Sequence, residues 1–241
     1  MFDPLYLLIM LVTLVLSIWA SGKVKFNFAK FSRIPNSRRL TGAQVAKMIL
    51  DYQDIRDVTV ETTRPNVLGK LGIGGDGILD DHYDPRVKKV RLSPQVYQGT
   101  SQAALAIAAH EVGHAIQHHT AYAPFKLRSV IAPAAALGSN FSYLLIFMGF
   151  IVHSMGMIKV GILLFSIAVL FQFITLPVEW DASRRAKVLV QHYNIAQSGE
   201  EAAGVSKLLN AAALTYVAAA AAALLNLLYL LFRTGLLGNR R

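Results

Sequence analysis

The sequence of 241 residues contains no cysteine. Disulfide bonds and thiolate metal ligands are therefore both excluded, and any metal in this protein must be bound by His, Asp or Glu. Charged residues are also scarce, at 16% of the chain, whereas a typical soluble domain carries about a quarter. Because 54% of the residues are hydrophobic, this composition indicates a protein that lies largely in a lipid bilayer.

Acidic residues are fewer than basic ones, 14 against 24, so the formal net charge is +10. A nucleic-acid-binding protein would gather its basic side chains on one folded face. Here Lys and Arg instead flank apolar segments, as they do in membrane proteins. The charge pattern therefore predicts no nucleic-acid partner, and the expected partner is the lipid bilayer.

Uncharged apolar runs occur at four places along the chain. Each is long enough to cross about 30 Å of hydrocarbon, which takes roughly 17–25 helical residues. We therefore expect a multi-pass membrane protein with about four transmembrane helices, mainly α with a small β element (α+β). The predicted parts are a transmembrane anchor (1–21), a soluble region (22–128), a two-helix transmembrane hairpin (129–178), a polar segment with a helix (179–210), a transmembrane helix (211–232) and a basic tail (233–241).

The first apolar run is interpreted as a retained anchor, because no basic residue precedes it and no small-residue cleavage site follows it. By the positive-inside rule, the basic residues after this run place the N-terminus outside and residues 22–128 in the cytoplasm. Those basic residues are Lys23, Lys25, Lys30, Arg33, Arg38 and Arg39. Arg233, Arg240 and Arg241 fall outside in this arrangement and oppose it.

The soluble region predicts both helix and strand. Thr41 is a suitable N-cap for an amphipathic helix, and Val58–Thr62 and Val87–Leu92 have the pattern of short strands. The glycine-rich stretch Gly69–Gly77 is interpreted as a turn-rich loop rather than a phosphate loop, because no Lys-Ser/Thr pair follows it. The strand at Val87–Leu92 is the expected edge for pairing with an extended peptide.

Residues 110–114 read His-Glu-Val-Gly-His, which is an H-E-x-x-H sequence. The alanine-rich run over 101–119 predicts a helix that Ser101 can cap. The four-residue spacing puts His110 and His114 on one helix face, one turn apart, where both imidazoles can bind one ion. Glu111 lies about 100° further round the helix and can reach a water molecule on that ion. The helical context favours a catalytic zinc helix over two surface histidines or a non-catalytic metal site.

A catalytic zinc site usually has three protein ligands and one open position. Glu179 is the best candidate for the third ligand, because an acidic residue at the end of a membrane span is costly unless it is used. Two predicted crossings separate His114 from Glu179, so both lie on the same side of the membrane. Asp181 and His118 are the rival ligands, and Glu179 could instead be an interfacial carboxylate paired with an arginine.

Three stretches together resemble the YugP-like neutral zinc metallopeptidases of bacterial membranes: His82-Tyr-Asp-Pro-Arg, Val90-Arg-Leu-Ser, and the run from Ala108 to Gln117. More distantly, H-E-x-x-H followed by E-x-x-A resembles the HtpX and CAAX-prenyl-protease group of membrane gluzincins. The resemblance implies Zn²⁺ as cofactor and a zincin-like catalytic region over 22–128. It also implies that the segment 179–210 supplies the third ligand, so the implied zinc ligands are His110, His114 and Glu179.

The gluzincin resemblance also shows one departure. The Asp that lies four residues after the third ligand in that group, where it supports the metal-binding histidines, is replaced here by Ser183. Asp181 is the alternative support for the histidines.

Together these features predict a membrane-embedded zinc-dependent endopeptidase, a hydrolase acting on protein or peptide substrates with Glu111 as general base. The expected location is the bacterial cell membrane, with the active site facing the cytoplasm. The sequence leaves the transition-state donor open and does not predict the oligomeric state; the candidate donors are His192, Tyr193, Arg184 and Arg185. The alternatives are a non-catalytic metal-binding membrane scaffold and, with less support, a transporter, for which no inverted repeat is visible.

Overall fold

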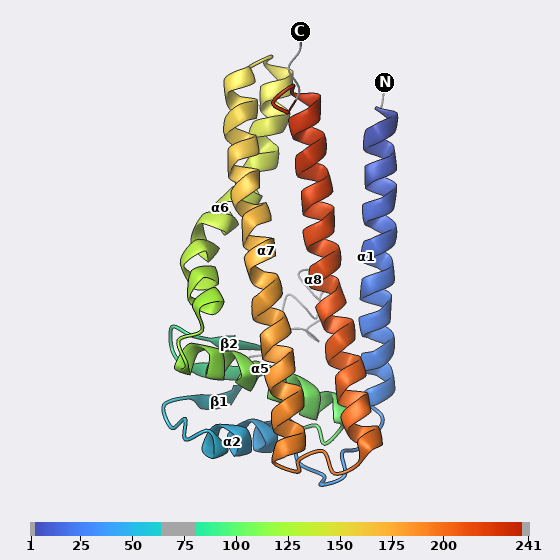
Figure 1. Ribbon diagram of the computed structural model, residues 1–241, viewed down its shortest axis with the longest axis vertical. Helices are drawn as coiled ribbons and strands as arrows, with labels where there is room; N and C mark the ends of the chain where they lie inside the picture. The colour runs from blue at the N-terminus through green and yellow to red at the C-terminus, as the bar shows by residue number, and fades with distance from the viewer. Residues whose placement is uncertain (1–2, 64–80, 238–241) are drawn as a thin grey trace. The chain divides into compact units, whose positions relative to one another are not determined.

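The computed structural model describes residues 3–63 and 81–237, so the glycine-rich stretch Gly69–Gly77 lies outside the described residues (Figure 1). The expectation of a mainly α protein with a small β element is confirmed. The strands are β1 (Thr59–Thr62), β2 (His82–Asp84) and β3 (Lys89–Leu92). The helices are α1 (Pro4–Phe31), α2 (Gly42–Tyr52), α4 (Pro94–Gln98), α5 (Gln102–His119), α6 (Ala123–Ile151), α7 (Met155–His192) and α8 (Gly199–Arg233).

Four of the described helices, α1, α6, α7 and α8, are long and apolar enough to cross a membrane, which confirms the expected number of spans. The chain forms two compact units. We call the first the membrane unit; it comprises Met1–Ser21, Ala123–Pro177 and Leu214–Arg241. We call the second the catalytic unit, because it contains the residues that the sequence predicts to be catalytic; it comprises Gly22–Tyr122 and Val178–Ala213.

Within the membrane unit, α6 and α7 approach one another at small residues. A Cβ atom added at Gly138 would lie 2.5 Å from the backbone oxygen of Leu164, and one at Gly161 would lie 2.9 Å from that of Ser142. Side chains larger than hydrogen would therefore separate the two helices at these positions. This close contact is typical of membrane helices, which associate by packing because lipid supplies no hydrophobic driving force between them.

The catalytic unit contains a three-stranded sheet in the order β1-β3-β2. Strand β3 pairs in parallel with β1 and antiparallel with β2, so it is the central strand. The prediction that Val87–Leu92 forms an edge for peptide pairing is therefore wrong. Sequence patterns predicted the segments of β1 and β3 but neither β2 nor the strand order, which makes β1 and β2 the edges of the sheet among the described residues.

Helix starts in the catalytic unit follow the predicted capping residues. Thr41 and Gln44 form a reciprocal capping box at the start of α2, and the Ser101 hydroxyl accepts a hydrogen bond of 3.1 Å from the Ala104 N–H at the start of α5. Gly113 lets α5 pack against the backbone of α7, since a Cβ there would lie 2.7 Å from the oxygen of Ala182. This contact fixes the middle of α5 beside the turn of α7 that carries Glu179.

Candidate metal centre and active site

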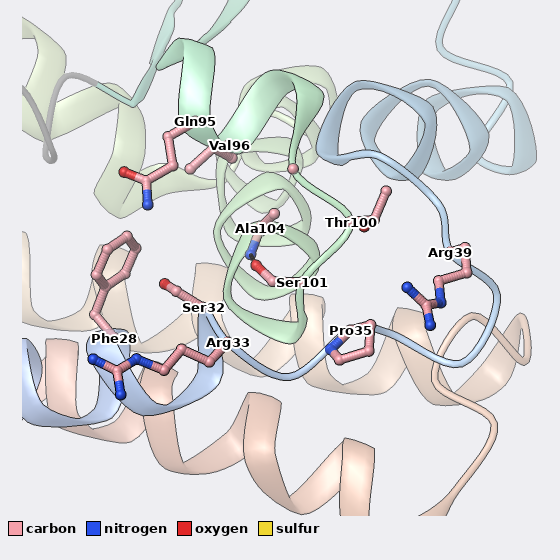
Figure 2. Close-up of a pocket in the computed structure, with 11 residues that line it drawn as sticks. Phe28, Ser32, Arg33, Pro35, Arg39, Gln95, Val96, Thr100, Ser101 and Ala104 are labelled. Carbon is pink, nitrogen blue, oxygen red and sulfur yellow. Dashed lines mark hydrogen bonds between the residues drawn. The ribbon is translucent and has the colours of Figure 1, made fainter.

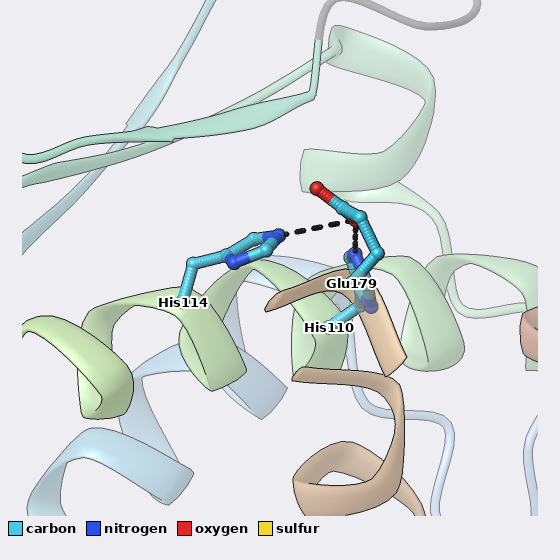
Figure 3. Close-up of side chains that lie close together, drawn as sticks. All are labelled: His110, His114 and Glu179. Atoms are coloured by element: carbon cyan, nitrogen blue, oxygen red, sulfur yellow. Dashed lines mark hydrogen bonds and ion pairs between the residues drawn. The ribbon is translucent and has the colours of Figure 1, made fainter. Parts of the chain in front are cut away.

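His110 and His114 on α5 point toward Glu179 on α7 (Figure 3). The Glu179 Oε2 atom lies 3.2 Å from His110 Nε2 and 3.5 Å from His114 Nε2. Two atoms bound to one tetrahedral zinc ion at about 2.1 Å are about 3.4 Å apart. Both Glu179 distances match this spacing, and the ligand atoms of the three side chains all lie within 4.8 Å of one another, so the group could hold a metal ion.

The three side chains of this group are largely buried, so the charge of Glu179 must be balanced nearby. The side chains of His110, His114 and Glu179 are 13%, 9% and 3% exposed. A carboxylate withdrawn from water is costly unless it is paired with a cation. A divalent metal ion bound by the three side chains supplies that positive charge, so burial also fits a metal centre.

Glu111 follows His110 directly in the sequence and is 7% exposed. The pKa of Glu111 is raised to about 7, mainly by burial and also by the nearby carboxylates of Glu179 and Asp81, while His110 opposes the shift. The backbone N–H of Tyr83 in β2 donates a hydrogen bond to Glu111 and favours its ionised form. A carboxylate with a pKa near neutrality can both accept and return a proton at physiological pH.

Comparison with known proteins gives two matches. The protein family described as "Putative neutral zinc metallopeptidase" matches residues 6–235. This chain belongs to that family. The "Putative membrane protease YugP" of Bacillus subtilis (strain 168) is 45% identical over 224 residues, which cover 93% of this chain and 94% of the relative. No solved structure matches.

Membership of this zinc metallopeptidase family identifies the cofactor as zinc and the protein as a peptidase. The relative is named a "Putative membrane protease", and α1, α6, α7 and α8 have the length and composition of membrane spans. The protein is therefore an integral membrane protein. Within it, the group formed by His110, His114 and Glu179 is able to bind the metal.

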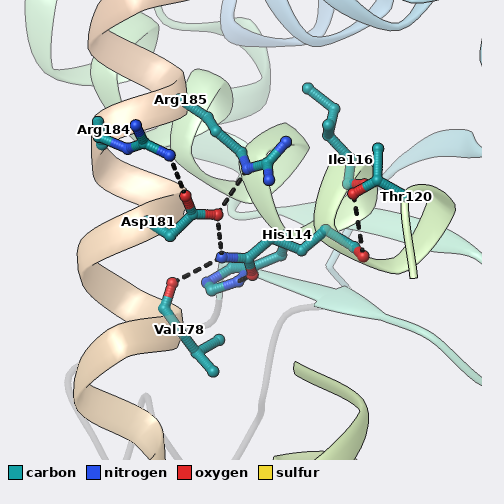
Figure 4. A network of polar contacts seen from close by, with 8 residues as sticks. His114, Ile116, Thr120, Val178, Asp181, Arg184 and Arg185 are labelled. Atoms are coloured by element: carbon teal, nitrogen blue, oxygen red, sulfur yellow. Dashed lines mark hydrogen bonds and ion pairs between the residues drawn. The ribbon is translucent and has the colours of Figure 1, made fainter. Parts of the chain in front are cut away.

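Support for His114 comes from Gln117, which is fully buried. The Oε1 atom of Gln117 lies 3.0 Å from His114 Nδ1, and its Nε2 atom donates to the backbone oxygen of Val178 at 2.8 Å and to Asp181 Oδ2 at 3.0 Å. Asp181 also accepts hydrogen bonds from Arg184 at 2.7 Å and Arg185 at 2.6 Å, as Figure 4 shows. A chain of polar contacts thus connects His114 to two arginines.

His110 has a different and simpler support. The Ser183 Oγ atom lies 3.2 Å from His110 Nδ1, so the serine that replaces the expected Asp still contacts a candidate metal-binding histidine. Asp181 reaches His114 through Gln117. Sequence reasoning did not assign a role to Gln117, although its position three residues after His114 on one helix was a usable signal.

The rival third ligands have other partners. Asp181 pairs with two arginines. The ring of His118 contacts Tyr83 instead, with the Tyr83 hydroxyl 2.8 Å from His118 Nδ1. Burial raises the pKa of Tyr83 to about 12, so this hydroxyl stays protonated at neutral pH. Among the described residues, the group whose ligand atoms lie within 4.8 Å of one another consists of His110, His114 and Glu179 and includes neither rival.

The structure also shows the positions of the four candidate transition-state donors. Arg184 and Arg185 bind Asp181. Tyr193 stacks on Tyr52, with the ring centroids 4.2 Å apart, and its hydroxyl accepts a hydrogen bond from the side chain of Gln53. His192 is the last residue of α7, and it lies 13 positions after Glu179, which corresponds to about 20 Å of helix. None of these described contacts directs the four side chains at the metal-binding group.

A pocket of about 320 Å³ lies elsewhere in the catalytic unit (Figure 2). Its walls come from the end of α1, the loop after it, α4 and the start of α5, and they include no His, Asp or Glu. Ser101 in this wall precedes His110 by nine residues, or about 13 Å of helix. The pocket therefore has no ligands for zinc and is separate from the candidate metal centre.

Proposed function

We propose that this protein is a membrane-embedded zinc-dependent endopeptidase of the gluzincin type. In this proposal His110, His114 and Glu179 bind zinc, and Glu111 is the general base. The observation that carries it is the position of one Glu179 oxygen 3.2 Å and 3.5 Å from the two histidine Nε2 atoms. H-E-x-x-H on a helix with a glutamate from a second helix is the ligand arrangement of that type of peptidase.

The chain's own residues account for proton transfer. Zinc, when bound, supplies a Lewis acid that activates water and polarises the scissile carbonyl. Glu111 accepts the proton from the attacking water and returns it to the leaving amine. Glu111 is buried and follows His110 directly on α5, which suits both steps, and the Tyr83 N–H holds the carboxylate in place between them.

The sheet offers a site for an extended substrate. Among the described residues, strand β2 pairs with β3 and with no other strand, and the Tyr83 N–H lies close enough to Glu111 to donate a hydrogen bond to it. We infer that the unpaired edge of β2 faces the general base. A protein or peptide segment that pairs with this edge would pass beside Glu111 with its backbone recognised and its sequence largely free.

We also propose that the protein lies in the bacterial cell membrane with the catalytic unit in the cytoplasm. The basic residues that follow the first span support this orientation by the positive-inside rule. Lys23, Lys25 and Lys30 all lie on α1 within the catalytic unit. Modification of a single introduced cysteine at residue 30 in intact cells would test it, because a membrane-impermeant thiol reagent should leave that position unlabelled.

The proposal is tested by comparing wild type with Glu111→Gln in detergent-purified, zinc-loaded protein acting on an unfolded protein substrate. We expect hydrolysis to fall by about 10²–10⁴-fold, the usual contribution of general acid–base catalysis, while the zinc content stays the same. His114→Ala serves as the control for contaminating peptidases and should also be inactive. Equal hydrolysis by wild type and Glu111→Gln, or bound zinc with no hydrolysis by wild type, would contradict the proposal.

A further inference from the structure

The contacts of Gln117 determine which end of its side-chain amide faces His114. Its Nε2 atom lies 2.8 Å from the backbone oxygen of Val178 and 3.0 Å from Asp181 Oδ2. A carbonyl oxygen can only accept hydrogen bonds, and so can a carboxylate that is paired with arginines. Both contacts therefore require the NH₂ end of the amide, and the amide oxygen must face His114.

The orientation of the amide in turn decides the tautomer of His114. The Gln117 Oε1 atom, 3.0 Å from His114 Nδ1, has no proton to donate. A hydrogen bond between them therefore requires the proton on His114 Nδ1. The neutral ring then carries its lone pair on Nε2, which is the nitrogen 3.5 Å from Glu179 Oε2.

We propose that Gln117 is a positioning residue that fixes His114 in the Nδ1–H tautomer and so presents its Nε2 lone pair to the metal. This inference rests on the proposed zinc site. Asp181 acts one step further away: it holds the Gln117 amide, and Arg184 and Arg185 balance its charge. A metal-binding histidine usually receives this support from a carboxylate or a backbone carbonyl. His114 receives it from the uncharged side-chain amide of Gln117, which in turn contacts the Asp181 carboxylate.

The contact to His110 differs in one physical respect. Ser183 Oγ lies 3.2 Å from His110 Nδ1, and a hydroxyl can rotate to donate or to accept. Ser183 therefore follows the tautomer of His110 and does not impose one. Ser183→Ala is consequently the matched control for a substitution at Gln117, since both remove a hydrogen bond to the Nδ1 atom of a metal-binding histidine.

The first test measures zinc affinity by chelator competition for wild type, Gln117→Leu and Ser183→Ala at one fixed pH. We expect Gln117→Leu to bind zinc about 10–100-fold more weakly, the usual effect of losing such a partner. Ser183→Ala should lose clearly less. Equal affinity in Gln117→Leu and wild type, or equal losses in the two variants, would overturn the inference.

The second test reads the tautomer directly and does not depend on how well a variant binds zinc. Zinc-free Glu179→Ala protein with ¹⁵N-labelled histidine is used, because it lacks the carboxylate that would otherwise accept a proton from His114 Nε2. At a pH where the rings are neutral, its His114 signal should show the Nδ1–H tautomer. That signal is assigned by its loss when His114→Ala is added, and it should shift toward Nε2–H when Gln117→Leu is added. An Nε2–H tautomer in Glu179→Ala with Gln117 present would overturn the inference. Failure of wild type to bind zinc would instead contradict the proposed function, so the two failures are distinguishable.

Discussion

The two units use apolar helices in opposite ways. In the membrane unit, only 6% of the apolar stretch of α1 is buried, and large side chains such as Leu11 and Ile18 are 56% and 63% exposed. In the catalytic unit, most of the 18 residues of α5 are buried, and Glu111 and Gln117 are among them. The first unit thus places apolar groups outward toward lipid, whereas the second encloses polar groups that carry out chemistry.

This difference implies that mutations should act differently in the two units. Lipid chains are as apolar as a leucine side chain, so a lipid-facing residue contacts a similar environment whether or not the helices are packed together. A residue inside the catalytic unit exchanges water for protein when the unit folds. Substitutions in α5 should therefore alter stability and metal binding, whereas substitutions at exposed positions of α1 should leave both nearly unchanged.

Replacing one leucine in each unit by alanine should give the largest difference in unfolding free energy between the two units. Leu105 on α5 is fully buried, so Leu105→Ala should lower the unfolding free energy by about 2–5 kcal/mol. Leu11→Ala on α1 should change it by less than about 0.5 kcal/mol, as surface substitutions do. Thermal unfolding in detergent measures both, and similar shifts in the two variants would remove the contrast between the units.

The buried carboxyl of Glu111 gives a pH dependence to the catalytic unit. The folded pKa is raised to about 7 from 4.5, so the folded protein keeps a proton that the unfolded chain loses between these values. The free energy of unfolding of wild type should therefore fall as pH rises through this window. At about 1.36 kcal/mol per pKa unit, the total loss is about 3 kcal/mol. In zinc-free protein, Glu111→Gln should be more stable than wild type above pH 7 and equal to it below pH 4.5. A stability difference that does not change with pH would refute this prediction.

The contact between α5 and α7 should tolerate little added volume. Gly113→Ala places a methyl group 2.7 Å from the Ala182 oxygen and should cost about 1–3 kcal/mol by overpacking. It should also weaken zinc binding, because α7 carries Glu179 at this contact. Gly22→Ala is the matched control, since nothing lies within 4 Å of the added atom and alanine favours a helix. Equal stability and zinc affinity in the two variants would show that the contact does not position the ligand.

Hydropathy and spacing were sufficient for part of this molecule. The four spans could be predicted, because a helix that crosses a membrane needs only sufficient length and an apolar composition. The pairing of His110 with His114 followed from helix periodicity. Glu179, 65 residues after His114, became the candidate third ligand because an acidic residue at the end of a span is costly unless it is used, and the count of membrane crossings agreed with it.

Other features depend on contacts that a single sequence does not encode locally. The strand order β1-β3-β2 arises from pairing between segments, and the assignment of the peptide-binding edge to Val87–Leu92 was wrong for this reason. The role of Gln117 depends on α7 lying close enough to present Val178 and Asp181 to one amide. Sequence reasoning considered Asp181 as direct support for a histidine and missed the residue between them.

The proposed zinc site is tested most directly by the zinc content of detergent-purified protein, measured by elemental analysis for wild type, His114→Ala and Glu179→Ala. We expect about one zinc ion per chain in wild type and a large loss in both variants. Retention of zinc in Glu179→Ala would contradict the three-ligand site, and absence of zinc from wild type after reconstitution would contradict the zinc peptidase mechanism itself.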